Sequence, residues 1–200
     1  MPTRAPDRPP RRLSAAARRD QLVKAAMPLV AEHGFADFSF DELAARADVT
    51  RNLLYHYFPR GREDIVLAVV ERAGRELTDD WVTDDSLPLG ERLAANFTRI
   101  AEHALGPSDA WLIHRRARAA TEPELTAVSA AFTEAVVESV ALNHLGTRRP
   151  PALVRLALAG YLSFAETVLD QARVARTPSR ARVMRLLAET LVATIAAAQG

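Results

Sequence analysis

The chain has 200 residues, with 26 Lys and Arg against 25 Asp and Glu, a formal net charge of +1 and no cysteine. The missing cysteine excludes a disulfide framework, a thiolate metal site and a cysteine nucleophile. Because the first twenty residues are rich in Pro and Arg, and no apolar run approaches about 18 residues, we expect neither a secretory signal nor a membrane span, and we expect a cytoplasmic protein.

Positive charge is concentrated at the N-terminus. Residues 1–24 hold seven basic and two acidic groups, net +5, so residues 25–200 must sum to −4 to give the overall +1. Within this stretch, residues 1–13 hold four prolines and four arginines and have no helical period. We therefore expect a disordered basic arm at 1–13, which suits a polyanionic partner better than the overall charge suggests.

The rest of the chain predicts an all-α fold. Alanine, the best helix former, supplies 38 of the 200 residues, and the apolar residues follow helical rather than alternating spacing. The expected helices span 15–33, 40–47, 51–57, 63–80, 89–104, 108–119, 122–144, 152–175 and 178–198.

Local start and stop signals set several of these boundaries. Ser39, Thr50 and Thr177 are placed to act as N-caps, because their hydroxyl groups can accept hydrogen bonds from unpaired backbone amides. Pro178 suits the first position of the last helix, and Gly34 suits the end of the first one. The signals divide the chain into several short helices followed by long ones.

The second and third predicted helices are short and lie about three residues apart, which is the outline of a helix-turn-helix. In the third helix only Leu54 and Phe58 need to face a core. Its remaining polar and aromatic side chains would be costly to expose unless a partner covers them. Arg and Asn at a helix start can contact base edges, and Tyr can reach phosphates. The alternative is that Tyr55 and Tyr57 pack against neighbouring helices.

These motifs lie within a longer stretch, from Arg19 to about Val70, that resembles the TetR family of bacterial transcriptional regulators. The shared order is a first helix ending His-Gly-Phe, then Phe-Ser-Phe-Asp-Glu-Leu-Ala, Ala-Asp-Val-Thr and Leu-Tyr-His-Tyr-Phe-Pro. The resemblance implies a DNA-binding domain at 14–62 and a ligand-binding and dimerisation domain at 63–200, with about nine helices in all.

The resemblance also implies which residues contact DNA. They are Ser39, Thr50, Arg51, Asn52, Leu53, Tyr55, His56 and Tyr57. Family members commonly have Gly where this chain has Asp48, a residue that tolerates the left-handed conformation less well, yet we expect the turn to survive. Where the family has a phosphate-contacting Lys at the start of the fourth helix, the replacements are Arg60 and Arg62, of which we favour Arg62.

No motif for catalysis or metal binding occurs. The histidines stand at 33, 56, 103, 114 and 144, without the paired spacing of a metal site. The chain has no Gly-rich phosphate loop and no nucleophile motif. We expect no catalytic residue, no metal, no cofactor and no enzymatic activity.

Interior aromatic and polar residues are candidates for an effector cavity between the fourth and eighth helices. These candidates are Trp81, Phe97, Trp111, Arg115, Tyr161 and Glu166. Trp111, Arg115 and Arg118 share one helix face, where an aromatic ring and two cations suit an anionic ligand. The alternative is a core Trp beside a solvated Arg face, and each of the other residues can equally be plain core.

The last two helices carry broad apolar stripes. Similarity to the family implies that they pair with their copies across a two-fold axis as a four-helix interface, and the alternative is an intrachain core. The candidate interface residues are Leu153, Leu156, Gly160, Phe164, Val183, Leu187, Thr190 and Leu191.

Together these patterns predict a ligand-responsive transcriptional regulator, most readily a repressor, that binds a palindromic DNA operator as a homodimer and is released by a small-molecule effector. The fourth helix would link the two sites. Such a protein acts in the cytoplasm, at the nucleoid when bound to DNA, and needs no membrane. The alternatives are a DNA-binding protein of the same fold without an effector, and a helical carrier or enzyme without specific DNA binding.

Overall fold

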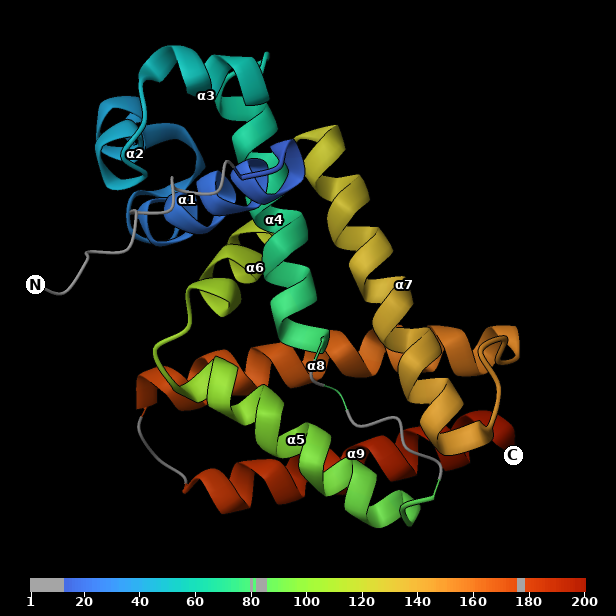
Figure 1. Cartoon of the computed structure of the whole chain (residues 1–200). Coiled ribbons are helices and arrows are strands. Elements are labelled where there is room, and N and C mark those ends of the chain that lie inside the picture. Colours follow the sequence, from blue (N-terminus) through green and yellow to red (C-terminus); the bar gives the residue numbers. More distant parts are fainter. Residues whose placement is uncertain (1–12, 80, 82–85, 176–178) are drawn as a thin grey trace, which may run out of the picture.

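The computed structural model describes residues 13–79, 81, 86–175 and 179–200 (Figure 1). Nine α-helices and no strand occur in these residues, which confirms the all-α prediction. The helices are α1 (Ala15–Asp37), α2 (Phe40–Arg46), α3 (Arg51–Tyr57), α4 (Arg62–Thr78), α5 (Leu89–Leu105), α6 (Asp109–Ala119), α7 (Pro123–Leu145), α8 (Ala152–Ala175) and α9 (Arg180–Gln199). Of the predicted basic arm, only residue 13 lies within the described part of the chain.

Hydroxyl side chains begin the two short helices as expected. The Ser39 hydroxyl accepts a hydrogen bond from the Glu42 amide at 3.3 Å, and the Thr50 hydroxyl accepts one from the Leu53 amide at 3.4 Å. Gly34, with φ of +87°, interrupts α1, but the helix continues for one further turn beyond the predicted end. Local capping chemistry therefore fixes the bounds of α2 and α3 closely.

The predicted start of the last helix is not borne out at its first residues. Thr177 and Pro178 lie outside the described residues, and in the described part α9 begins at Arg180, with Ser179 in the N-cap position. The helix is thus described from two residues later than the sequence signal indicated.

The turn between α2 and α3 depends on Asp48. Its φ is +53°, and it is the one non-glycine among the described residues with a positive φ. The Asp48 amide donates to the Ala45 carbonyl at 3.2 Å, and the Val49 amide donates to the Ala44 carbonyl at 2.9 Å. Asp48 therefore occupies the left-handed position expected for it, and the turn is closed by backbone hydrogen bonds.

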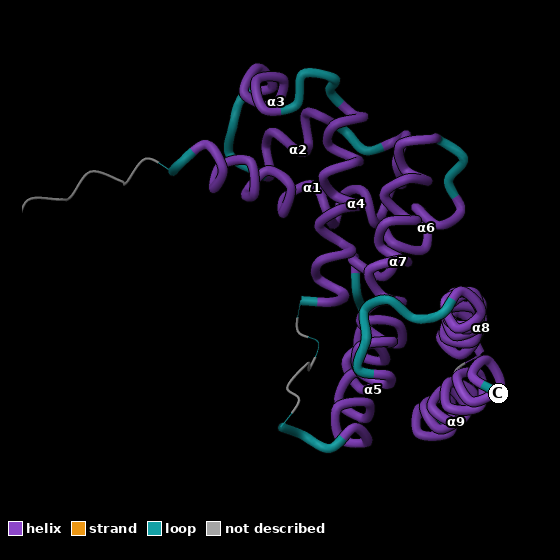
Figure 2. The backbone as a smooth tube through the Cα atoms, turned by 90° about the vertical axis from the view of Figure 1, so that its right-hand side faces the viewer, coloured by secondary structure: helices purple, strands orange, loops and turns teal. Residues whose placement is uncertain are grey.

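One hydrophobic core runs through the molecule. The helix-turn-helix of α2 and α3 lies at one end, and α8 and α9 lie side by side at the other (Figures 1 and 2). Helix α4 descends between the two ends, and α1 packs against both α4 and α6. The predicted DNA-binding segment therefore packs, through α1, against α4 and α6.

By length and composition alone, α7 and α8 are apolar enough to cross a membrane. Core helices of globular proteins meet the same criterion, so the observation is weak evidence for a span. Here α7 packs against α4, α6 and α8, and α8 packs against α5, α7 and α9. Both helices nevertheless keep many residues uncovered by the chain itself.

Candidate functional site

Helix α3 presents a polar and aromatic face to solvent. Leu54 and Phe58, four residues apart, are fully buried and hold the helix on the core, as predicted. The exposed side chains of α3 are Arg51, Asn52, Tyr55 and His56. Leu53 and Tyr57 are half-buried. The outward face of this helix is thus composed of groups that can donate or accept hydrogen bonds.

The two tyrosines of α3 have different surroundings. Tyr55 is 45% exposed, and its ring stacks on Phe40 with 5.5 Å between centroids. Tyr57 packs against the core and meets His56 edge-on at 5.1 Å. Packing against neighbours, the alternative considered above, therefore describes Tyr57 better than Tyr55, whose supported ring still faces outward.

Arg51 is held by a carboxylate at the start of α2. Its Nη1 lies 3.2 Å from both carboxylate oxygens of Asp41, and both side chains are exposed. An exposed ion pair of this kind contributes little to stability. It does place a negative charge directly beside the arginine at the exposed start of α3.

The two arginines expected to contact phosphate are already engaged within the chain. Arg60 donates from Nε to Asp64 at 2.8 Å and from Nη1 to Glu124 at 2.8 Å. The Arg62 Nη1 donates to the Phe38 carbonyl at 2.8 Å, and its guanidinium lies 4.5 Å from the Phe38 ring centroid. The Arg62 guanidinium therefore contacts Phe38, the residue before the N-cap of α2, and the preference for Arg62 as a phosphate contact stays a prediction.

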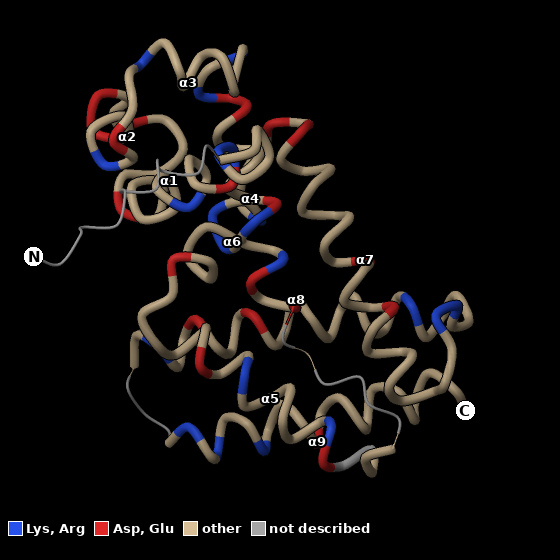
Figure 3. Tube along the Cα trace, in the orientation of Figure 1, with Lys and Arg blue, Asp and Glu red and all other residues tan. Residues whose placement is uncertain are grey.

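Other basic groups of the N-terminal helices are paired as well. Acidic and basic residues alternate around α1, α2 and α3 (Figure 3). Lys24 lies 3.1 Å from Asp20, and Arg46 lies 3.4 Å from Glu42. The helix-turn-helix thus shows a mixed rather than a uniformly positive surface.

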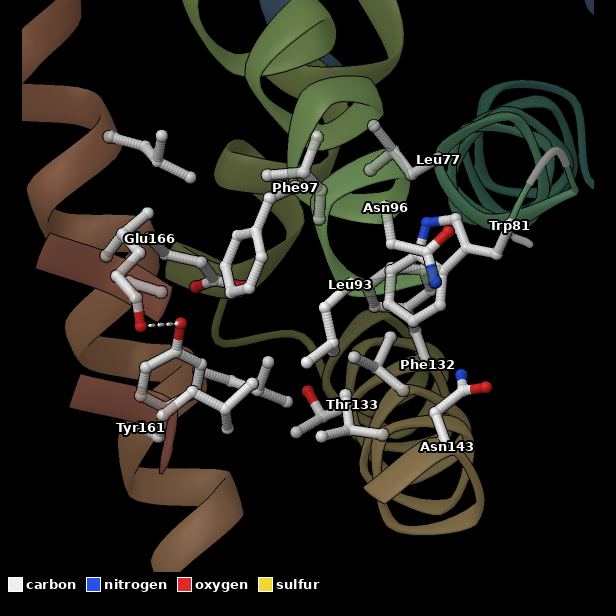
Figure 4. A pocket seen from close by; sticks show the side chains of 18 of the residues that line it. Leu77, Trp81, Leu93, Asn96, Phe97, Phe132, Thr133, Asn143, Tyr161 and Glu166 are labelled. Carbon is white, nitrogen blue, oxygen red and sulfur yellow. Dashed lines mark hydrogen bonds between the residues drawn. The ribbon is translucent and has the colours of Figure 1, made fainter. Parts of the chain in front are cut away.

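A second site lies at the opposite end of the core. A cavity of about 100 Å³ is enclosed by residues from α4 to α9 (Figure 4). Five of the six predicted effector residues line it, namely Trp81, Phe97, Trp111, Tyr161 and Glu166. Most of its other walls are apolar, and the sixth predicted residue, Arg115, is not among the lining residues.

The carboxylate of Glu166 is enclosed by cationic side chains. His114 Nε2 lies 2.9 Å from Oε1, Arg118 Nε lies 3.3 Å from Oε2, and the Arg115 guanidinium also meets Oε2. Burial acts to raise the pKa of Glu166, but the hydrogen bond from His114 and the nearby positive charges lower it below its ordinary value overall. Glu166 is therefore an ionised and fully partnered group.

Arg115 and Trp111 are tied to a second carboxylate on α8. Asp170 accepts hydrogen bonds from Trp111 Nε1 at 3.1 Å and from Arg115 Nε at 2.7 Å. The expectation that Arg115 binds a ligand is corrected, because its guanidinium bridges Glu166 and Asp170 outside the cavity. The shared face of α6 thus meets two carboxylates of α8 instead of an anionic ligand.

Two polar atoms of the cavity lining, Trp81 Nε1 and His144 Nε2, are buried without a hydrogen-bond partner. The amide of Asn143, which is 6% exposed, also lines the cavity, and neither Asn143 nor His144 was among the predicted effector residues. Burial lowers the pKa of His144, with a further contribution from the positive charge of Arg92. For Asn143 and His144 the sequence did contain a signal, because two adjacent polar residues stand within the apolar end of a long predicted helix.

Helix α6 connects the cavity with α1. Trp111 and His114 of α6 line the cavity, while Arg116 of the same helix donates from Nη1 to the Val30 carbonyl of α1 at 2.6 Å. The helix expected to couple the two ends of the molecule was α4. In the structure α6 spans the same interval, so both helices join the two ends.

The predicted dimer residues divide into two groups. Leu153, Leu156 and Phe164 of α8 are 61%, 70% and 38% exposed, Gly160 is exposed, and Thr190 is half-buried. The prediction is wrong for the remaining three, Val183, Leu187 and Leu191, which are buried within the chain. The stripe of α9 that contains them faces the intrachain core, and Leu187 and Leu191 line the cavity.

Residues 22–69 match the model of the bacterial regulatory proteins of the tetR family. A tetR-family transcriptional regulator from Streptomyces coelicolor is 27% identical and covers 93% of this chain and 83% of that chain, with a TM-score of 0.73. A TetR-like regulator from Rhodococcus sp. RHA1 is 19% identical over 92% of this chain and 99% of that chain, with a TM-score of 0.69. The multidrug binding protein EbrR complexed with ethidium is 20% identical over 86% of this chain and 98% of that chain, with a TM-score of 0.64.

A comparison with curated proteins gives no match. The match at residues 22–69 includes α2, α3 and parts of α1 and α4. The similarity in fold to the Streptomyces protein extends over nearly the whole chain. The family consists of regulatory proteins, in agreement with the expectation that the chain is not an enzyme. Residues 22–69 thus match the tetR family of bacterial regulatory proteins, and the chain is similar over most of its length to a tetR-family transcriptional regulator.

Proposed function

We propose that the protein is a ligand-responsive repressor that binds a palindromic operator as a dimer and releases it when a small molecule occupies the cavity. The observation that carries the proposal is that an exposed polar helix and an apolar cavity belong to one hydrophobic core. A short helix presents Arg51, Asn52 and Tyr55 outward, and an apolar cavity lies at the far end of the helices that support it.

The exposed face of α3 supports reading of the major groove. Arg and Asn can each form paired hydrogen bonds to base edges, and Tyr and Ser hydroxyl groups can contact phosphates. The Ser39 hydroxyl accepts a backbone hydrogen bond and keeps its own proton to donate. Two copies of α3 about one DNA turn apart would read two half-sites of a palindrome.

The uncovered apolar stripe of α8 supports pairing of two copies. Leu153, Leu156 and Phe164 lie on one face of α8, and Leu186 and Val192 of α9 are also exposed. Contiguous exposed apolar side chains of this kind mark an interaction surface. A second copy would cover the face without requiring a membrane, which fits a cytoplasmic protein.

The cavity supports control by a small molecule. EbrR, of similar fold, is described as a multidrug binding protein with ethidium bound. An effector lowers operator affinity only to the extent that it prefers one conformation of the dimer over the other. Helices α4 and α6, which both run from the cavity to the N-terminal helices, are the elements that such a preference would displace.

Selection of genomic DNA fragments by the purified protein tests the proposal. We expect recovery of a palindromic motif, and we expect Arg51→Ala to abolish protection of that motif while leaving the fold intact. Arg75→Ala, at the end of α4 remote from α3, is the matched control. Recovery of no shared motif would sink the proposal, and a motif that no small molecule releases would favour the alternative without an effector.

A further inference from the structure

We propose that the cavity takes a small neutral ligand with a compact apolar skeleton, such as a single aromatic ring, and one hydrogen-bond-accepting group. The inference rests on the proposed role of the cavity as the effector site. It specifies the chemical class of the effector from three properties of the walls: their size, their charge balance and their unpartnered donors.

The size and lining of the cavity favour one ring over a fused polycycle. Its volume is about 100 Å³, and Phe97, Phe132 and Trp111 contribute aromatic walls. A dry apolar cavity of roughly 150 Å³ holds benzene in another protein, so the walls of this smaller cavity must move apart even for a single ring. A fused dye such as ethidium would require a much larger displacement of the same walls.

The charge balance disfavours an ionised ligand. Among the described lining residues Glu166 is the one carboxylate, and both of its oxygens are engaged by His114 and by the arginines at 115 and 118. A cationic ligand would therefore find no negative group without a partner. An anionic ligand would meet the Glu166 charge while the two arginines stay bound to carboxylates, since Arg115 also holds Asp170. Burying an unpaired charge in such a site is costly.

The unpartnered polar groups call for an acceptor on the ligand. The indole Nε1 of Trp81 can only donate a hydrogen bond, and it is buried without a partner. The amide of Asn143 and the ring of His144 lie in the same lining, and burial together with the nearby charge of Arg92 lowers the pKa of His144 and keeps it neutral. A ligand carbonyl or ether oxygen would satisfy the Trp81 donor, whose desolvation is otherwise uncompensated.

These polar groups lie apart from the ion-paired wall. Trp81 and Asn143 are on one side of the cavity, across from Glu166 and Tyr161 (Figure 4). The Tyr161 hydroxyl is already satisfied, because it donates to the Leu187 carbonyl at 2.9 Å. The ligand is therefore oriented with its accepting group toward Trp81 and its apolar end toward Tyr161.

Binding of four single-ring compounds to the full chain tests the ligand class. The probes are methyl benzoate (neutral with an acceptor), toluene (neutral without one), benzoate (anion) and benzyltrimethylammonium (cation). Both tryptophans of the chain line the cavity, so intrinsic fluorescence reports occupancy directly. We expect methyl benzoate to bind about fivefold tighter than toluene and the two ions to bind more weakly than either. Tighter binding of an ion, or no binding of any probe, overturns the proposal.

Two matched variants test the donor by calorimetry. Trp81→Phe keeps an aromatic ring and removes the unpartnered donor, so the ratio of the toluene and methyl benzoate dissociation constants should fall to about one. Tyr161→Phe removes a hydroxyl that is already satisfied, and the ratio should stay unchanged. A ratio within one variant does not depend on how much of that variant is folded. An unaltered ratio in Trp81→Phe overturns the assignment.

Operator binding is measured separately, so the two proposals can fail independently. If a polycyclic cation such as ethidium releases the operator and methyl benzoate does not bind, the ligand class is wrong and the regulatory function stands. If the probes bind in the expected order and no operator is recovered, the regulatory function is wrong and the ligand class stands.

Discussion

Among single residues, Arg51 shows how one carboxylate can adjust a DNA-binding face. Its guanidinium is held by Asp41 at 3.2 Å, and both side chains are exposed. If Arg51 contacts a base or a phosphate through Nη1, this pair has to open, and the Asp41 carboxylate would then lie close to the DNA. The pair therefore opposes binding to DNA in general, while a correct base sequence can compensate for its loss.

We predict that Asp41→Asn strengthens binding to DNA of arbitrary sequence by about fivefold at low salt and makes the slope of log affinity against log salt steeper by about 0.9, because one more cation contacts phosphate. Fluorescence anisotropy with a labelled duplex over a salt series measures both quantities. Glu71→Gln, which removes an exposed carboxylate from α4, is the control and should change neither. An unchanged slope for Asp41→Asn would mean that Arg51 does not face DNA.

The residues whose roles could be predicted from the sequence interact with residues that are close to them in the chain. Ser39 and Thr50 cap helices three residues away, and Asp48 closes a local turn. The hydrogen bond of Arg62 was not foreseen, because its partner, the Phe38 carbonyl, is a backbone atom made available by the tertiary fold. No spacing in the sequence signals a hydrogen bond of that kind.

At the scale of elements, the joint between α3 and α4 depends on Gly61. Its φ is +64° and its ψ is −117°, a backbone conformation that side chains rarely adopt. A Cβ at this position would lie 3.4 Å from Cε1 of Tyr55 and 3.7 Å from Cζ of Phe40. Gly61 thus sets the angle at which α3 leaves the core and supports the ring of Tyr55.

Replacing Gly61 with Ala should lower the free energy of unfolding by about 2 kcal/mol, since alanine would be strained at φ +64° and ψ −117°, although its Cβ would make only ordinary contacts with the two rings. Gly146→Ala is the matched control, because Gly146 has a similar φ of +67° but a ψ of 16°, in the left-handed helical region. We expect a smaller loss there, about 1 kcal/mol. Urea denaturation gives both values, and equal losses would contradict a special role for the joint.

Helix positions could be predicted from periodicity and caps, whereas helix partners could not. The stripe of α9 that contains Val183, Leu187 and Leu191 reads equally well as an interface between copies or as core, and burial within the chain settles it as core. The same limit applied to the α6 arginines. Arg115 lies on a helix face suited to a ligand, but Asp170 and Glu166, more than fifty residues away in sequence, neutralise that face.

At the scale of the whole molecule, α8, which carries the exposed apolar residues, lies at the end opposite α3 (Figure 2). In the single chain Leu153 and Leu156 remain mostly exposed, so a large part of α8 has no intrachain neighbour. Pairing through this face would leave both copies of α3 accessible to DNA.

If two copies pair through α8 as proposed, Leu156→Glu should raise the dissociation constant of the dimer by about 100-fold or more, because each copy would bury an unpaired charge. Sedimentation velocity over a range of concentrations measures the shift. Ala131→Glu places the same charge on the exposed side of α7 and should leave assembly unchanged. A Leu156→Glu protein that still sediments as a dimer would place the interface elsewhere.

Pairing through α8 would also make the protein sensitive to its own abundance. Where most chains are monomers, the number of dimers rises with the square of the number of chains, so halving the chains removes about three quarters of the dimers. A fall in the concentration of the chain would then cut operator occupancy more steeply than it cuts that concentration. The exposed leucines of α8 would thereby give growth rate and gene dosage an influence on transcription alongside that of the effector.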